Sequence, residues 1–548
     1  MTNKFYVTTP IFYVNAAPHM GHAVALAIAD TLARAHRLKG DDTYFLTGTD
    51  EHGGKIARAA EAAKLSPQKF VDQVSAQFQE LASAMMISND QFIRTSDKKA
   101  HHPGAIALWN ALVASRDMYR AEYEGLYCVG CESFVTEHEL LDGKCKLHDQ
   151  IPEQLKEENY FFRISEYVER IRAHITSDQI QVLPTERKNE VLAMIDAGVA
   201  DVSFSRPAKD IPWGIPVPND ATQTMYVWCD ALANYISALG YQGGDEPASN
   251  MTRFWPADVH VIGKDILRFH AILWPGMLLA AGLPLPKTIL VHGFLNSGGR
   301  KMSKTLGNTI DPMEALKRHG SDVLRNFLIA EVPTFSDGDF TLDRFEELYE
   351  ARFVNGIGNL TSRIATMIEK YAGGILARPP EDLLRTVRLS RTIGTVEGGV
   401  LEAAGEDPAS YVRDVLGASW KAALEGGNVQ ELARTGCSAL DLADEYIQEH
   451  EPFKLYATDP EKAKAVVWNA AMLLLGGTEL LSPVIPETCA RVRKIYGLKE
   501  DGVIDLATLT ELKANHPEPM FPRSSSAKHE AQKTKNETSS NDKSPKHT

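Results

Sequence analysis

The chain has 548 residues, of which 44% are hydrophobic and 24% are charged. These values are ordinary for a folded globular protein, and they exclude a wholly disordered chain. The formal net charge of −14 argues only weakly against a nucleic-acid partner, because local basic patches decide that question rather than the total. At about 150 residues per domain, the length predicts three or four domains.

No segment has the character of a membrane span or a targeting signal. The longest apolar stretch, residues 271–285, is interrupted by Pro275, Gly276 and Pro284, whereas a membrane span needs about 20 apolar residues in a row. The first 15 residues, MTNKFYVTTPIFYVN, are not rich in Arg and lack a charged segment followed by an unbroken apolar run. Six cysteines are too few for a disulfide scaffold. We therefore expect a cytoplasmic protein with no membrane partner.

The first 60 residues predict a strand, a helix and a second strand. Residues 4–14 are rich in Phe, Tyr, Val, Thr and Ile, as in a buried strand. From Gly21 the apolar residues recur at four-residue spacing, which predicts a helix that Gly40 ends, and residues 43–48 predict the next strand. A strand–helix–strand unit requires parallel strands, so the fold class is α/β with a doubly wound, Rossmann-type parallel sheet.

Later segments predict an interruption of this domain and a helical region after it. The strand–helix pattern breaks near Arg116 and returns near Met225, with strands at 258–262 and 288–294. After about Phe345, amphipathic stretches at 348–371, 429–447 and 462–481 predict helices, and the last residues are almost free of apolar side chains. The predicted segments are the first half of a split α/β domain over 1–115, an insertion over 116–224, the second half over 225–345, an all-helical domain over 346–510 and a disordered tail over 511–548.

Three cysteines and a histidine in the insertion have the spacing of a zinc site. They are Cys128, Cys131, Cys145 and His148, in the pattern Cys-x2-Cys-x13-Cys-x2-His. Three thiolates and one imidazole suit tetrahedral Zn²⁺, and nothing indicates an open fourth position, so we expect one structural zinc ion. The insertion has little hydrophobic material of its own, so the metal would hold this zinc knuckle folded.

The segment His19-Met20-Gly21-His22 lies at the start of the first predicted helix. Histidines at i and i+3 lie on the same side of a helix, and the helix N-terminus adds a partial positive charge. Gly21 leaves room for a ligand close to the backbone. This combination suits a triphosphate. The alternative is a pair of turn histidines with no role.

The second motif, KMSKT at residues 301–305, follows a strand and a glycine-rich segment. A doubly basic loop of this kind can fold over phosphates and neutralise the charge that develops in a transition state. A solvated surface loop is the alternative for this motif taken alone.

In this order on an α/β domain, HMGH and KMSKT resemble the HIGH and KMSKS signatures of the class I aminoacyl-tRNA synthetases. Over residues 4–510 the chain is most similar to the methionyl-tRNA synthetase family. The resemblance implies that the split domain is the catalytic domain, that residues 225–345 include a stem-contact region, and that Mg²⁺ accompanies ATP. The implied catalytic residues are His19, His22, Lys301 and Lys304, and the implied ATP-binding residues are these four with Gly263 and Asp265, the last of which would bind the ribose.

The resemblance also implies a methionine pocket. Asp50, in GTDEHG, matches the carboxylate that holds the substrate ammonium, and Ile266 and His270 match residues that close on the side chain and its sulfur. The chemistry is coherent, because a polarizable thioether suits aromatic walls. The implied methionine-binding residues are Ile11, Tyr13, Asp50, Trp228, Ala231, Leu232, Tyr235, Ile266 and His270.

The helical domain carries a set of residues that resembles the anticodon reader of this family. Asn359 and Arg363 are spaced i, i+4, so they share a helical face from which they can hydrogen-bond an unstacked base. Phe453 matches a position that usually holds Trp, and it keeps a stacking face without the indole N–H. The alternative is a helix N-cap, an exposed Arg and a core Phe.

By resemblance the chain joins methionine to tRNA. ATP activates L-methionine to methionyl-adenylate, and the methionyl group then passes to the 3′ end of the initiator and elongator forms of tRNA-Met. We expect a monomer, because no oligonucleotide-binding domain follows residue 510. The alternatives are another class I synthetase, of the Leu, Ile, Val or Cys type, and a tRNA-binding relative without catalysis. The first group usually carries a large editing insertion or, for cysteine, an active-site zinc, and the second has no need of both motifs.

Overall fold

The structure is a computed structural model, and it divides into two compact units. The first joins Met1–Arg318 to Glu331–Asp339, and the second joins His319–Ala330 to Phe340–Thr548. The residues that the structure describes are 3–128, 133–135, 140–146, 149–244, 248–301, 310–389, 394–396, 399–401, 407–500, 502–515 and 519–523.

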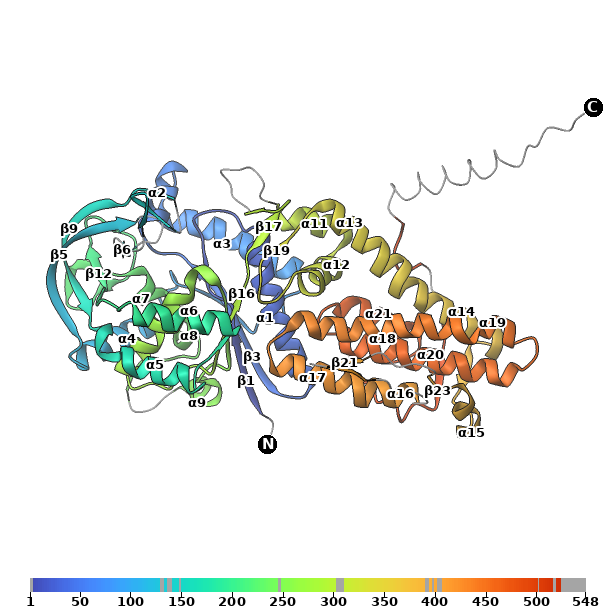
Figure 1. Cartoon of the computed structure of the whole chain (residues 1–548). Coiled ribbons are helices and arrows are strands. Elements are labelled where there is room, and N and C mark those ends of the chain that lie inside the picture. Colours follow the sequence, from blue (N-terminus) through green and yellow to red (C-terminus); the bar gives the residue numbers. More distant parts are fainter. Residues whose placement is uncertain are drawn as a thin grey trace, which may run out of the picture. The chain divides into compact units, whose positions relative to one another are not determined.

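The first unit is built around a seven-stranded sheet in which every pairing is parallel (Figure 1). The strand order is β10-β16-β15-β1-β3-β2, and β4 pairs with β3. The strands are β1 (Lys4–Thr8), β2 (Phe12–Tyr13), β3 (Asp42–Asp50), β4 (Gln91–Arg94), β10 (Gln181–Leu183), β15 (Val259–Gly263) and β16 (Thr288–His292). The predicted parallel α/β sheet is confirmed, and its strands β1–β4 and β15–β16 come from separate parts of the chain.

Helix α1 (Met20–Leu38) packs against β1 and β3, where most of its side chains are buried and many of them are Ala. Gly40 lies in the turn that follows this helix and has a φ of +83°. Glycine adopts this left-handed angle readily because it has no Cβ. The other helices of this part of the chain are α2 (Gly54–Ala62), α3 (Pro67–Ala84), α4 (His102–Ala114), α5 (Val168–Thr176), α6 (Thr185–Asp196), α7 (Val227–Leu232), α8 (Asn234–Ser237), α9 (Ser249–Phe254), α10 (Trp274–Ala280) and α11 (Pro312–His319).

The single strand predicted over residues 4–14 is two strands. β1 ends at Thr8 and pairs with β3 and β15, whereas β2 pairs only with the carboxyl end of β3, opposite Thr49 and Asp50. Pro10 lies in the break, and its missing N–H cannot continue a ladder of hydrogen bonds in a central strand.

The insertion forms antiparallel sheets, but it is not continuous over residues 116–224 as predicted. β10 lies inside that range and joins the parallel sheet beside β16. Three residues are too few to give a readable strand pattern, which is why the sequence did not reveal this return. The antiparallel strands are β5 (Met118–Cys128), β6 (Ser133–Val135), β7 (Leu140–Leu141), β8 (Lys144–Cys145), β9 (Glu153–Phe162), β11 (Val202–Ser203), β12 (Ser205–Pro207), β13 (Pro216–Val217) and β14 (Asp220–Met225).

A small three-stranded sheet follows the parallel sheet in the first unit. β17 (Leu295–Ser297) pairs antiparallel with β18 (Arg300–Lys301) and parallel with β19 (Gly338–Asp339). The KMSKT loop therefore starts from the end of a hydrogen-bonded strand.

The second unit is a helical bundle centred on α20 (Pro460–Leu481), which is buried along most of its length. It packs closely against α18 (Val429–His450): a Cβ on Gly477 would lie 2.9 Å from the Cβ of Ala439. The remaining helices are α12 (Ser321–Asn326), α13 (Leu342–Leu348), α14 (Asn359–Ala372), α15 (Glu381–Leu384), α16 (Pro408–Ser410), α17 (Gly417–Glu425), α19 (Pro452–Leu455) and α21 (Pro486–Ile495). The helices predicted over 429–447 and 462–481 form as α18 and α20. The stretch predicted over 348–371 is helical but divided, because Tyr349–Gly358 is π-helical with a kink at Gly356 and α14 begins only at Asn359.

Two predictions for this region need correction. The unit is not all-helical, because β20 (Ile375–Ala377) pairs with β23 (Glu511–Lys513), and β21 (Gly394–Val396) pairs with β22 (Gly399–Leu401). The tail does not begin at residue 511, because β23 buries Leu512 completely and the ring of Phe521 lies 5.3 Å from that of Phe353. Single apolar side chains, such as Leu512 and Phe521, anchor these short segments. Single apolar residues do not raise the hydrophobic content of a segment enough to mark it as folded.

Across the described residues, none of the helices combines the length and the apolar character that crossing a bilayer requires.

Candidate active site

A cavity of about 460 Å³ lies at the carboxyl ends of the parallel strands, the edge at which open α/β sheets bind ligands. Its walls include Asp50 at the end of β3, Gly263 at the end of β15 and His292 at the end of β16. Every residue predicted to bind methionine or ATP, apart from the two KMSKT lysines, lines this cavity: Ile11, Tyr13, His19, His22, Asp50, Trp228, Ala231, Leu232, Tyr235, Gly263, Asp265, Ile266 and His270.

The two histidines of HMGH are locked together at the N-terminus of α1. His19 is the N-cap, and its Nδ1 accepts from the backbone N–H of Gly21 at 3.1 Å. Nδ1 of His22 accepts from the backbone N–H of His19 at 3.0 Å, and the two rings stack with centroids 3.8 Å apart. Because each Nδ1 accepts, each neutral ring carries its proton on Nε2, which is a donor suited to a phosphate oxygen. A Cβ at Gly21 would lie 3.0 Å from the His19 ring, so glycine leaves that ring its place.

Aromatic rings form one wall of the cavity. Trp228, on α7, stacks on Phe269 with ring centroids 3.8 Å apart and an interplanar angle of 6°. The ring of His270 meets Trp228 edge-on at 6.3 Å. Ala231 and Leu232, one helical turn further along α7, complete this wall. Such a surface suits an apolar, polarizable side chain.

His270 and Tyr235 form a buried polar pair within that wall. Nδ1 of His270 donates to the carbonyl oxygen of Ile266 at 3.0 Å, because a carbonyl can only accept. Nε2 therefore accepts from the hydroxyl of Tyr235, at 2.7 Å. Burial lowers the pKa of His270 to about 4 and raises the pKa of Tyr235 above its ordinary value, so both side chains are neutral at pH 7.

Another part of the cavity is formed by Gly263 and Asp265 of the GKD segment and by His292 at the end of β16. A Cβ at Gly263 would lie 2.7 Å from Oδ1 of Asp265, so glycine leaves room for that carboxylate. Lys264, between them, forms an ion pair with Asp337 at 2.7 Å, and Asp337 also accepts from the backbone N–H of Phe294 at 2.9 Å. These bonds tie the cavity to the sheet that carries the KMSKT loop.

The KMSKT loop itself is mostly beyond what the structure describes. The backbone of Lys301 belongs to β18, opposite Asn296 of β17. The side chain of Lys301 and the whole of Lys304 lie outside the described residues.

Two of the four predicted zinc ligands are described, and they share one cluster. Cys128 ends β5 and Cys145 ends β8, and both are buried in a small cluster with Val135, against which Leu126 and Leu140 pack. Cys131 and His148 lie outside the described residues. Within the described part of the chain no group of three metal-ligating side chains occurs. Two thiols converging from separate hairpins fit the two-knuckle zinc site that the spacing predicts.

The predicted anticodon residues lie on the surface of the second unit. Asn359 begins α14 and is exposed, and Arg363, one turn later, pairs with Asp444 of α18. Phe453, on α19, is 56% exposed. The alternative of a core Phe is therefore wrong, while the role of these residues stays a prediction.

Several cavity residues were not found from the sequence. They are Lys55, Asn234, Phe269 and His292, among others. Phe269 adjoins His270 and follows Ile266 by three residues, which is a helical spacing that could have identified it. Lys55 follows Asp50 by five residues, and the turn into α2 brings both residues to the cavity. Because that turn has no recognisable sequence pattern, the sequence did not indicate that Lys55 lines the cavity.

Known proteins match this chain along nearly its whole length. The sequence model described as class I tRNA synthetases (M) matches residues 5–145 and 135–365. The methionine–tRNA ligase of Mesorhizobium japonicum is 37% identical over 530 residues, which are 95% of this chain and 98% of that protein. The one from Caldanaerobacter subterraneus is 38% identical over 506 residues, 91% of this chain and 75% of that protein. The structure of Mycobacterium tuberculosis methionyl-tRNA synthetase in complex with methionyl-adenylate has a TM-score of 0.86 and 33% identity, covering 95% of this chain and 100% of that chain. The chain therefore belongs to the class I aminoacyl-tRNA synthetases, in the family of the methionine–tRNA ligases.

Proposed function

We propose that the protein is a methionine–tRNA ligase. An oxygen of the methionine carboxylate attacks the α-phosphorus of ATP, the bond from that phosphorus to the bridging oxygen breaks, and pyrophosphate leaves. The 3′-terminal hydroxyl of tRNA-Met, initiator or elongator, then attacks the carbonyl carbon of methionyl-adenylate, and AMP leaves with its electron pair. Homologous methionine–tRNA ligases covering nearly the whole chain support this reaction.

The single observation that carries the proposal is the shared cavity. Residues far apart in the sequence, predicted separately to hold an amine, a thioether and a nucleotide, line one space at the carboxyl edge of the sheet. A two-substrate reaction needs that arrangement, because holding both reactants together replaces much of the entropy cost of their encounter.

Methionine binding is assigned to one side of the cavity. The Asp50 carboxylate holds the ammonium group, and Ile11, Tyr13 and Leu232 border the side chain. Trp228, Ala231 and Ile266 contact its methylenes and methyl group. The neutral pair of Tyr235 and His270 contacts the sulfur atom of the methionine side chain.

ATP binding is assigned to the other side. Asp265 accepts from the ribose hydroxyls, and Gly263 lets the nucleotide approach the backbone. His19 and His22 donate to the phosphates through Nε2, and Lys301 and Lys304 neutralise the charge of the transition state. Mg²⁺ bound with ATP supplies further charge neutralisation. No covalent enzyme intermediate is needed, because the substrate carboxylate is the nucleophile.

We also propose a structural zinc ion held by Cys128, Cys131, Cys145 and His148. The ion would supply the folding energy of a small module with little core of its own. The buried position of the two described thiols supports this assignment.

The remaining proposals concern tRNA and organisation. Asn359 and Arg363 read anticodon bases and Phe453 stacks on one, which the exposure of Phe453 supports. The segments before and after the insertion form the catalytic domain, and the helical region binds the anticodon. The protein acts as a monomer in the cytoplasm, where its substrates ATP and tRNA are available.

Aminoacylation of a tRNA-Met transcript with radiolabelled methionine tests this function. Charging should require ATP, should fall strongly when the CAU anticodon is replaced, and should fall in Arg363→Ala with the native transcript. Charging that is indifferent to the anticodon would overturn the assignment of Asn359, Arg363 and Phe453, and no charging at all would overturn the function.

A further inference from the structure

Two sequence motifs contain residues that the reaction does not use. In GTDEHG, Asp50 lines the cavity, but Glu51 and His52 do not. In the segment VWCDA, residues 227–231, Trp228 and Ala231 line the cavity, but Asp230 does not. Glu51, His52 and Asp230 are nevertheless almost completely buried, with exposed fractions of 0%, 4% and 1%. Burying ionisable side chains is costly unless each one is paired, so their partners show what they do.

Asp230 bridges two histidines from different segments. Its Oδ2 accepts from Nδ1 of His52 at 2.6 Å, and its Oδ1 accepts from Nε2 of His101 at 2.6 Å. Nδ1 of His101 lies 2.9 Å from the hydroxyl of Ser237, on α8. Burial opposes ionisation of Asp230, but the attraction of His52 and the hydrogen bonds from both histidines outweigh it and hold the pKa of this carboxyl well below its usual range. The bridge therefore contains a carboxylate with both oxygens hydrogen-bonded.

The residue between Asp50 and His52 is held just as firmly. The Glu51 carboxylate accepts from Nε and Nη2 of Arg94 at 2.7 and 2.9 Å, and from the hydroxyl of Thr49 at 2.7 Å. Its backbone N–H donates to the hydroxyl of Thr95 at 2.8 Å. The segment that carries Asp50 is thus fixed on the side facing away from the cavity.

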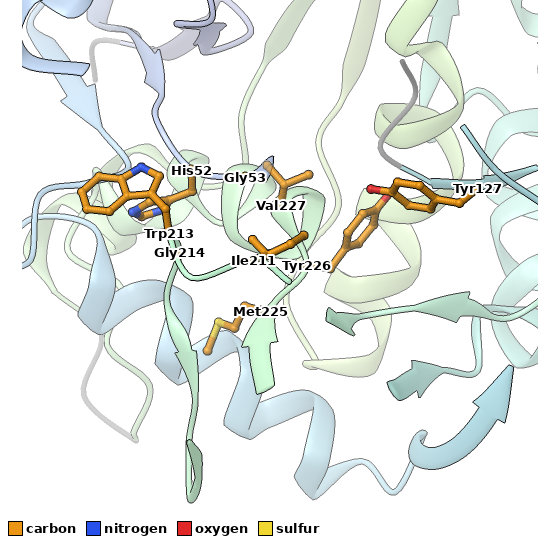
Figure 2. Close-up of a pocket in the computed structure, with 9 residues that line it drawn as sticks. All are labelled: His52, Gly53, Tyr127, Ile211, Trp213, Gly214, Met225, Tyr226 and Val227. Atoms are coloured by element: carbon orange, nitrogen blue, oxygen red, sulfur yellow. The ribbon is translucent and has the colours of Figure 1, made fainter. Parts of the chain in front are cut away.

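Figure 2 shows the surroundings of His52 in a small neighbouring pocket, with Trp213 beside it. The two rings meet edge to face, with centroids 5.5 Å apart. Trp213 also donates from Nε1 to the carbonyl oxygen of Glu51, and its own carbonyl accepts from the backbone N–H of Gly53 at 3.1 Å. His52 is therefore held in one orientation toward Asp230.

The bridge connects two chain segments that both line the cavity. His52 follows Asp50 by two residues at the end of β3, and Asp230 lies between Trp228 and Ala231 on α7. The proposed ammonium site is on the first segment and the proposed side-chain wall is on the second, so the separation of the two segments limits how far a bound amino acid can extend between them.

We propose that the His52–Asp230 bridge, anchored by His101, is a positioning device that sets the distance between the Asp50 carboxylate and the Trp228 wall. It makes the site selective for the length of the amino acid side chain. His52 and Asp230 are positioning residues, because neither lines the cavity. The inference rests on the proposed function, in which Asp50 holds the ammonium.

Steady-state ATP–pyrophosphate exchange tests this proposal with methionine and with ethionine, which is one methylene longer. His52→Leu removes the donor, whereas His52→Asn keeps an N–H near the position of Nδ1. In His52→Leu, kcat/KM for methionine should fall by about 30-fold or more, because misplacement of about 1 Å can cost about 100-fold. The preference for methionine over ethionine should shrink, the KM for ATP should change less than threefold, and His52→Asn should restore most of the loss.

A matched control exists at the C-terminal end of α1, away from the cavity residues His19 and His22. His36 and Asp41 form a similar bridge, with Nδ1 2.7 Å from Oδ2, and burial lowers the pKa of His36. His36→Leu should lower the melting temperature as His52→Leu does, but should leave the KM for methionine and the methionine-to-ethionine ratio unchanged.

If His52→Leu loses stability but keeps the wild-type ratio of methionine to ethionine, the bridge is only structural and the proposal fails. The same holds if KM for ATP rises as much as KM for methionine. If His52→Leu does not fold, Asp230→Asn, which keeps the side-chain volume and one acceptor, gives the same readouts. A wild-type protein that shows no exchange with methionine would refute the proposed function instead, so the two failures are distinguishable.

Discussion

The hydroxyl of Tyr235 donates a hydrogen bond to Nε2 of His270 at 2.7 Å, and both side chains are about 1% exposed. The tautomer is fixed by the carbonyl of Ile266, which accepts from the other ring nitrogen. This pair therefore presents satisfied polar atoms to the cavity and carries no charge at pH 7. A thioether, which is a weak acceptor, can lie against such a pair without competing for a strong hydrogen bond.

Replacing Tyr235 with Phe tests that pair. The change removes one buried hydrogen bond and leaves Nε2 of His270 without its donor, so the KM for methionine should rise about tenfold, in line with a cost of about 1–3 kcal/mol for an unsatisfied buried group. The KM for ATP should not change. Exchange kinetics measured at varied methionine concentration decide the matter, and an unchanged KM would remove this pair from the methionine site.

The low pKa of His270 predicts a pH dependence of stability. Its folded-state pKa of about 4 lies below the ordinary value of about 6.5, so the unfolded chain binds the proton first. The contribution of neutral His270 is complete above pH 6.5 and is lost as the pH falls toward 4. At pH 5 the loss amounts to about 2 kcal/mol.

Urea unfolding of the wild-type protein and of His270→Gln, at pH 7.5 and pH 5, measures that loss. The variant should lose about 2 kcal/mol less than the wild type between the two pH values. Burial also lowers the pKa of His292, which is present in both proteins, so its effect cancels. The pKa of His260 is lowered first by burial, which both proteins share, and then by the charge of His270. Equal losses in the two proteins would show that His270 titrates normally.

Gly263→Ala should weaken ATP binding without unfolding the protein. The backbone at this position has a φ of −76°, which alanine adopts freely, but the new Cβ would displace the Asp265 carboxylate. The KM for ATP should rise at least about tenfold, because a hydrogen bond to a charged group is worth about 1.5–3 kcal/mol. Gly417→Ala, in a helix of the second unit, is the control, because the new Cβ would lie 3.5 Å from the carbonyl oxygen of Val412, an ordinary van der Waals contact. Equal ATP constants in the two variants would contradict the ribose assignment.

Removal of a zinc ligand should unfold the insertion module and release the metal. Elemental analysis of the purified protein should give about one zinc per chain, and Cys145→Ser should give far less, since the site would lose one of its four ligands. Cys437→Ser, in the second unit, should retain the zinc. Metal content that is the same in both variants, or no zinc in the wild type, would exclude the proposed ligand set.

The parts of the fold that the sequence predicted are those in which a long segment keeps one regular spacing of apolar residues. The parallel sheet followed from a strand–helix–strand unit, and α14, α18 and α20 followed from long amphipathic stretches. Short elements were missed because β10 and β23 have three residues each, and the position of each depends on a partner strand far away in the sequence. Pro10 marked the break between β1 and β2, but only sheet pairing explains why the chain continues as a strand beyond it.

The same distinction holds for the cavity. Asp50, His19 and Trp228 lie in segments that the resemblance to the family identified, and all three line the cavity. The bond between His52 and Asp230 joins residues 178 positions apart and follows no local pattern. Local sequence can therefore indicate the groups that face a ligand, while the buried contacts that hold them in place depend on the complete fold.

The central claim, that this cavity activates methionine, is tested most directly by ATP–pyrophosphate exchange with each of the twenty amino acids in turn, without tRNA. Exchange with methionine alone, abolished in Asp50→Ala, is the predicted result. Stronger exchange with another amino acid would contradict the methionine pocket, and the absence of exchange from folded, zinc-containing protein would contradict the reaction itself.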